Sequence, residues 1–214
     1  MSDRDWFRQT EWTPSAAAQF QTKLARTRGQ RSEYLRIQAW TLADTGQLRN
    51  AAPAIELAKQ FLEVTKYKHG IAQAHRVMAR AFETLGDLPA AIDAYRRAVL
   101  AEREFPNARG CAYIDFAWFA ARHRMRNVYD EVVAALDSDL QDQDLIFPVR
   151  RFRYFGAFAL ISDDRGDREN AKRMAANALA AAAIEQGPFS RHPGIGLVRN
   201  ATDGSYEHIE RLAR

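Results

Sequence analysis

The sequence predicts an all-helical protein built as a row of about four antiparallel helix pairs. Alanine is abundant, and only 11 glycines and 7 prolines occur in 214 residues, which favours helix over strand. Apolar residues recur at spacings of one, three and four, the pattern of an amphipathic helix. The alanines in the middle of the expected first helices follow one another at intervals of 40, 38 and 42 residues: Ala39, Ala79, Ala117 and Ala159.

The clearest helix pair lies between Ala72 and Pro106. Gly86 separates two apolar faces, one made by Met78, Ala79 and Phe82, the other by Ala91, Ile92, Tyr95, Ala98 and Val99. Because Pro106 comes late, the second helix should be long.

This stretch resembles a tetratricopeptide repeat, whose pattern is W-x2-L-G-x2-Y, then A-x3-F, then P. Here the pattern is filled by His75-x2-Met78-Ala79-x2-Phe82, then Ala91-x3-Tyr95, then Pro106. The resemblance covers residues 32–186, with units of about 40 residues instead of about 34. It implies an α-solenoid, a superhelix in which the first helix of each pair lines a concave groove that accepts a peptide.

The other pairs follow the same pattern less closely. We expect the first pair at Ser32–Asp44 and from near Pro53, and the third at Asn107–His123 and about Asn127–Leu136. In the fourth pair, the first helix runs from about Phe152 to Asp164, and the second carries Ala171, Ala175 and Ala178. Gly46 and Gly166 match the turn at Gly86, whereas Arg124 to Asn127 occupies the third turn without a glycine.

The ends of the chain flank these repeats within a single domain, residues 1–214. Residues 1–31 hold an aromatic segment and an extra helix from Pro14 to about Arg28, and residues 187–214 hold a loop and a capping helix at about Ser205–Leu212. The aromatic side chains of Trp6, Phe7 and Trp12 need to be buried. We expect them to pack on the exposed end of the first repeat. Docking of these three side chains into another chain is the alternative.

Charge and cysteine usage narrow the function classes. The net charge of +4 permits an acidic partner without requiring one. The single cysteine, Cys111, excludes an intrachain disulfide and a cysteine-based zinc site, and its apolar neighbours predict a buried small residue. The charged start and the lack of a long apolar run predict a cytoplasmic protein with no membrane partner.

No motif for catalysis is evident. The five histidines have no metal-binding spacing, and neither a P-loop nor a dinucleotide loop occurs. The acidic run from Asp137 to Asp144 does not match a calcium loop. We therefore expect no enzyme activity, no cofactor and no metal.

The residues of the first helices that fall beside the packing stripe, on the groove side, are the candidate partner-binding residues. They are Arg36, Trp40, Arg76, Arg80, Trp118, Arg122 and Arg153. Arginine forks bind carboxylates and tryptophan buries a large apolar area beside them, so the groove suits an acidic peptide with a hydrophobic side chain.

The predicted function is thus a non-catalytic protein–protein interaction module, an adaptor or regulator. Basic residues interleaved with aromatics, at Arg122–Arg126 and Arg150–Tyr154, leave nucleic-acid binding as an alternative. Self-assembly into a homo-oligomer through the N-terminal aromatic segment is another.

Overall fold

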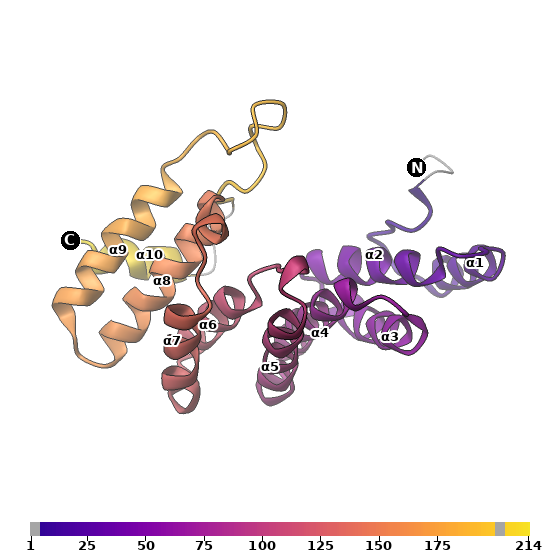
Figure 1. Cartoon of the computed structure of the whole chain (residues 1–214), viewed down its shortest axis with the longest axis horizontal. Helices are drawn as coiled ribbons and strands as arrows, with labels where there is room; N and C mark the ends of the chain where they lie inside the picture. The colour runs from indigo at the N-terminus through magenta and orange to yellow at the C-terminus, as the bar shows by residue number, and fades with distance from the viewer. Residues whose placement is uncertain (1–4, 200–203) are drawn as a thin grey trace. The chain divides into compact units, whose positions relative to one another are not determined.

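The computed structural model describes residues 5–199 and 204–214, which form α-helices and turns and no strand (Figure 1). The chain divides into two compact units, the first ending at Ala112 and the second beginning at Tyr113. The all-helical prediction is confirmed.

The first unit contains five helices. They are α1 (Pro14–Ala25), α2 (Arg31–Asp44), α3 (Leu48–Val64), α4 (Ile71–Leu85) and α5 (Leu88–Glu104). Each of α2 to α5 packs on its neighbour in sequence, and α2 also packs on α4. This is the order of contacts that stacked helix pairs produce, with the long α5 that the late Pro106 predicted.

The second unit contains the remaining helices of the described chain. They are α6 (Ala112–Arg122), α7 (Tyr129–Ser138), α8 (Pro148–Asp164), α9 (Arg168–Ala182) and α10 (Ser205–Leu212). Helix α8 packs on α9, and α10 lies against both of them. The apolar residue Ile209 of α10 is fully buried, so the C-terminal helix lies against the last helix pair, where the sequence predicts a cap.

The mid-helix alanines lie in the core, as their regular spacing predicts. Ala39, Ala79, Ala117 and Ala159 are all 1% exposed or less. A methyl side chain at these positions lets neighbouring helices approach closely. The sequence analysis missed Val77, which is buried in α4 while Met78 and Phe82 are half-buried at the edge of the core.

The turns inside three helix pairs use a glycine in the left-handed region, at φ values of 62° for Gly46, 77° for Gly86 and 82° for Gly166. Asp87 then caps α5 by accepting a hydrogen bond from the amide of Ala90 at 3.1 Å. In the third pair Arg124 takes the left-handed position, with φ 51°. The missing glycine is thus replaced by a strained residue, not by a different turn.

Four predicted helix boundaries were wrong. Helix α8 begins at Pro148, before Phe152. Helix α3 begins at Leu48, so Pro53 lies inside the helix. Helix α6 begins only at Ala112, because Pro106 to Ala108 forms a separate 3-10 turn and Cys111 has a positive φ of 62°. Helix α1 ends at Ala25, before Gly29. Cys111 itself is buried, as predicted.

The N-terminal aromatic segment packs inside its own unit, which confirms the expectation for Trp6, Phe7 and Trp12. The rings of Trp6 and Trp12 lie 5.3 and 5.4 Å from that of Phe20, and the ring of Phe7 lies 4.7 Å from that of Tyr34.

Two fully buried side-chain amides form hydrogen bonds that connect the same segment to the helices. Gln38 accepts a hydrogen bond from the amide of Gln9 at 2.9 Å and donates one to its carbonyl at 2.7 Å. Asn50 donates to the carbonyl of Thr10 at 2.8 Å. On the circumference of α2, Gln38 lies about opposite Arg36 and Trp40. The segment therefore leaves the predicted groove side of α2 uncovered.

Candidate partner-binding surface

The seven predicted residues fall into two groups, four in the first unit and three in the second. In the first unit, Trp40 on α2 lies beneath two arginines of α4. The guanidinium carbons of Arg76 and Arg80 are 5.8 and 5.4 Å from the centroid of the Trp40 ring. These distances place both cations within cation–π range of one half-buried indole.

Arg36 joins the same face one turn before Trp40. Its guanidinium bonds to Glu33 on its own helix and to Gln73 on α4. We call the face formed by Arg36, Trp40, Arg76 and Arg80 the α2–α4 surface.

The positive charge of this surface is partly balanced by acidic neighbours that the sequence analysis did not include. Arg80 pairs with Asp44 at 3.1 Å, and the Asp44 side chain is 58% exposed. The hydrogen bond and charge of Arg36 lower the pKa of Glu33 below its usual value. The signal for the first pair was available, since Asp44 and Arg80 are opposite charges 36 residues apart, about one repeat.

His75 precedes Arg76 on α4 and lies where the tetratricopeptide pattern has its tryptophan. Burial, with a smaller contribution from the charge of Arg97, lowers the pKa of His75 to about 4. The ring is therefore neutral at physiological pH and acts as a packing side chain.

In the second unit the predicted residues are more enclosed. Trp118 is only 8% exposed, and its ring lies 5.4 Å from that of Phe152. Arg122 lies over the Trp118 ring at 5.6 Å, and Arg153 donates to Asp115 at 2.6 Å. The structure brings these three side chains together at the α6–α8 contact, where the tryptophan is a core residue.

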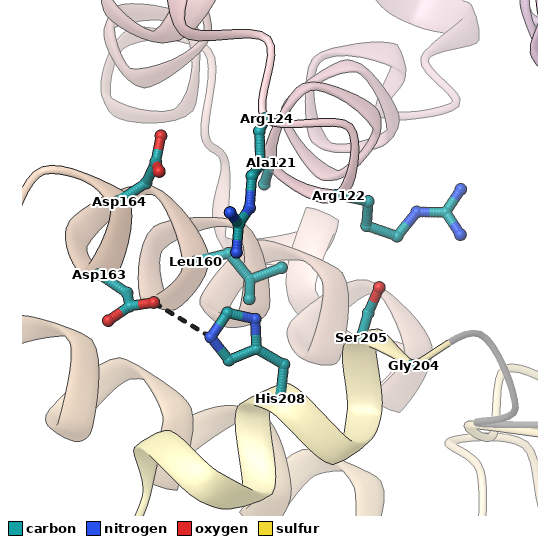
Figure 2. A pocket seen from close by; sticks show the side chains of 9 residues that line it. All are labelled: Ala121, Arg122, Arg124, Leu160, Asp163, Asp164, Gly204, Ser205 and His208. Carbon is teal, nitrogen blue, oxygen red and sulfur yellow. Dashed lines mark hydrogen bonds and ion pairs between the residues drawn. The ribbon is translucent and has the colours of Figure 1, made fainter.

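A pocket of about 200 Å³ opens beside this contact (Figure 2). Its lining comes from the ends of α6 and α8 and from the start of α10: Ala121, Arg122, Arg124, Leu160, Asp163, Asp164, Gly204, Ser205 and His208. His208 Nε2 lies 3.0 Å from Asp163 Oδ2. The sequence analysis missed this pair, whose members are 45 residues apart in unrelated motifs.

The pocket contains a hydroxyl, an imidazole and a carboxylate, the groups of a nucleophile, a base and its orienting partner. Figure 2 shows the hydroxyl of Ser205 pointing away from the His208 ring. These three side chains therefore do not form a relay that would activate the serine. Throughout residues 5–199 and 204–214, no cluster of three or more His, Cys, Asp or Glu side chains is placed to hold a metal ion.

Within the same described residues, no helix combines the length and the apolar character needed to cross a bilayer. Comparison of the chain with protein-family models, with curated proteins and with solved structures found no match.

Proposed function

We propose that this chain is a non-catalytic cytoplasmic adaptor or regulator of the tetratricopeptide-like class, which binds a partner peptide or protein through the α2–α4 surface. A superhelical stacking of its helix pairs is part of the proposal. The order of helix contacts and the four buried alanines support it.

The observation that carries the proposal is the half-buried indole of Trp40 with the guanidinium groups of both Arg76 and Arg80 over its ring. A tryptophan flanked by arginines has the composition of an interaction hot spot. The ring offers apolar area and the arginine forks offer paired donors for a carboxylate. A partner with an acidic residue next to a hydrophobic one complements both.

Asp44 would compete with such a partner, since it already pairs with Arg80. An incoming carboxylate exchanges one ion pair for another. Removing the carboxylate of Asp44 should therefore strengthen partner binding, while removing the guanidinium of Arg80 should weaken it. An exposed pair of this kind contributes about 0.2–1 kcal/mol, so the expected gain in affinity is roughly 1.4- to fivefold.

The experiment is affinity capture from a lysate of the cell that makes the protein, followed by identification of the bound chains. The test variant is Arg76→Gln with Arg80→Gln. The matched control is Arg96→Gln with Arg97→Gln, two exposed positions of α5. We expect the test variant to lose the captured partner and the control to retain it, with both keeping the melting temperature of the wild type within a few degrees.

Asp44→Asn then measures the competition with the identified partner by titration. Tighter binding is the expected result. Full capture by the Arg76→Gln, Arg80→Gln variant would show that the α2–α4 surface is not the binding site.

Neither alternative function is favoured by a specific contact. In the basic stretches that suggested nucleic acid, Arg126 makes two 2.6 Å bonds to Asp164, and Arg153 is paired with Asp115. The aromatic residues that suggested self-assembly pack within their own unit. Strong, salt-sensitive retention on heparin would support nucleic-acid binding. Elution of the protein at dimer size would support self-assembly.

A further inference from the structure

A second surface, independent of the proposed function, forms where the loop after α9 meets the start of α8. The amide of Val149 donates to the carbonyl of Gly196 at 2.8 Å. The rings of Phe147 and Phe189 lie 5.8 Å apart, and Gly196 packs against the Phe147 ring so closely that any Cβ there would collide with it. We call the residues 145–151 and 187–199 the Phe147 surface.

The backbone of this loop is held by its own hydrogen bonds. Gly187 donates to the carbonyl of Pro193 at 2.6 Å, and the amides of His192 and Ile195 donate to Phe189 and His192 at 2.9 and 3.0 Å. Figure 1 shows the loop projecting beyond the ends of α8 and α9 within the second unit. The surface is a projection and not a groove.

The projecting loop exposes apolar side chains around Phe147. Ile146, Phe189 and Ile195 are 45%, 49% and 48% exposed. Ile146 adjoins Phe147 in sequence, and the ring of Phe189 contacts the Phe147 ring. Ile195 precedes Gly196, the glycine that packs on that ring. Three large exposed apolar side chains on two contacting segments differ from the scattered exposed residues that any protein carries.

Arginines surround these apolar residues. Arg150 lies 5.1 Å from the centroid of the Phe147 ring, Arg151 bonds to the carbonyl of Leu145 at 2.6 Å, and Arg199 bonds to that of Gly194 at 2.8 Å. Arg191 is exposed in the same loop. The Phe147 surface contains these four arginines and no aspartate or glutamate.

From this charge and shape we infer, against the expectation from the sequence that the protein has no membrane partner, that the Phe147 surface binds the surface of an anionic phospholipid bilayer. Exposed apolar side chains on a projecting loop can enter the headgroup region, while the surrounding arginines contact lipid phosphates. The two isoleucines favour lipid over nucleic acid, because aliphatic side chains do not stack on bases. A peptide partner would be better matched by a concave site.

The test is co-sedimentation of the full chain with vesicles of phosphatidylcholine alone and of phosphatidylcholine mixed with phosphatidylglycerol. We expect binding to the mixed vesicles only, weakening as salt rises. Each arginine near an anionic membrane contributes roughly fivefold in binding, so Arg150→Gln with Arg191→Gln should lower it about 25-fold. Phe189→Ser with Ile195→Ser should lower it at least about tenfold.

The matched control is Leu100→Ser with Arg97→Gln, which removes an exposed apolar side chain and an arginine from α5. It should bind mixed vesicles as the wild type does. Absence of binding by the wild type, or equal losses in control and test variants, would overturn the inference. So would binding to a single-stranded oligonucleotide without binding to vesicles.

Because the four test substitutions, at Arg150, Phe189, Arg191 and Ile195, lie in the second unit, partner capture through Arg76 and Arg80 should be unaffected by them. The two proposals can therefore fail separately.

Discussion

At the scale of single residues, Arg124 carries a conformational cost that its equivalents avoid. Its φ of 51° is in the left-handed region, where the other three repeats have glycine. A non-glycine residue there costs about 1–2 kcal/mol, and glycine costs roughly 0.5–1 kcal/mol in unfolded-state entropy. We expect Arg124→Gly to raise the free energy of unfolding by about 0.5–1 kcal/mol, measured by urea denaturation.

Gly86→Ala is the matched control for that prediction. No atom lies within 4 Å of the Cβ it would add, so the backbone alone is strained. It should lower the free energy of unfolding by about 1 kcal/mol. A loss of stability in Arg124→Gly would show that the arginine side chain contributes more than its backbone conformation costs.

His75 makes the stability depend on pH. Burial lowers its pKa in the folded protein to about 4, whereas an unfolded histidine titrates near 6.5. Below about pH 6.5 the unfolded state binds the extra proton, so stability falls as the pH falls toward 4. Above about pH 6.5 His75 is neutral in both the folded and the unfolded state, so its titration does not change the stability.

The partly buried ring is still partly screened by solvent, so we expect the loss due to His75 between pH 7 and pH 5 to be about 1 kcal/mol. His75→Gln should show a correspondingly smaller loss in urea denaturation at the two pH values. Equal losses in both proteins would contradict the prediction.

At the scale of elements, the N-terminal segment depends on one side chain of α2. Gln38 pairs with both the amide and the carbonyl of Gln9. Gln38→Ala leaves those two groups without partners and should cost about 2–3 kcal/mol. We also expect faster trypsin cleavage after Arg8, which would report detachment of this segment and not global unfolding.

Gln19→Ala is the control for that measurement, because Gln19 is exposed on α1 and bonds to Ser15 of the same helix. It should change stability by less than about 0.5 kcal/mol and leave cleavage after Arg8 unchanged. An unchanged cleavage rate in Gln38→Ala would show that the aromatic packing alone holds the segment.

At the scale of the whole molecule, the first unit should fold without the second. Many of its buried residues, lying between Phe20 in α1 and Ala81 in α4, form one core cluster. We expect the fragment 1–110 to be helical and to melt in a single cooperative transition, followed by circular dichroism. A fragment ending at residue 86 lacks α5 and should melt broadly, because Ala79 and its neighbours lose their cover.

Local pattern was sufficient to predict several features of the fold. The spacing of Ala39, Ala79, Ala117 and Ala159 located the first helices, and the glycine turns separated them from their partners. The boundaries of α3 and α6 could not be predicted the same way. Pro53 is tolerated within a helix that begins earlier, and the 3-10 turn after Pro106 has no distinct signal in the sequence.

The sequence by itself determined the helical class and the pairing of helices, because both depend on periodicities of a few residues. Only the tertiary structure decided which arginines are paired and which tryptophan is buried. Arg80 and Arg153 bond to carboxylates 36 and 38 residues away, and Trp118 is enclosed while Trp40 is not. Those outcomes depend on which side chains of neighbouring helices come into register, and helix packing fixes that register.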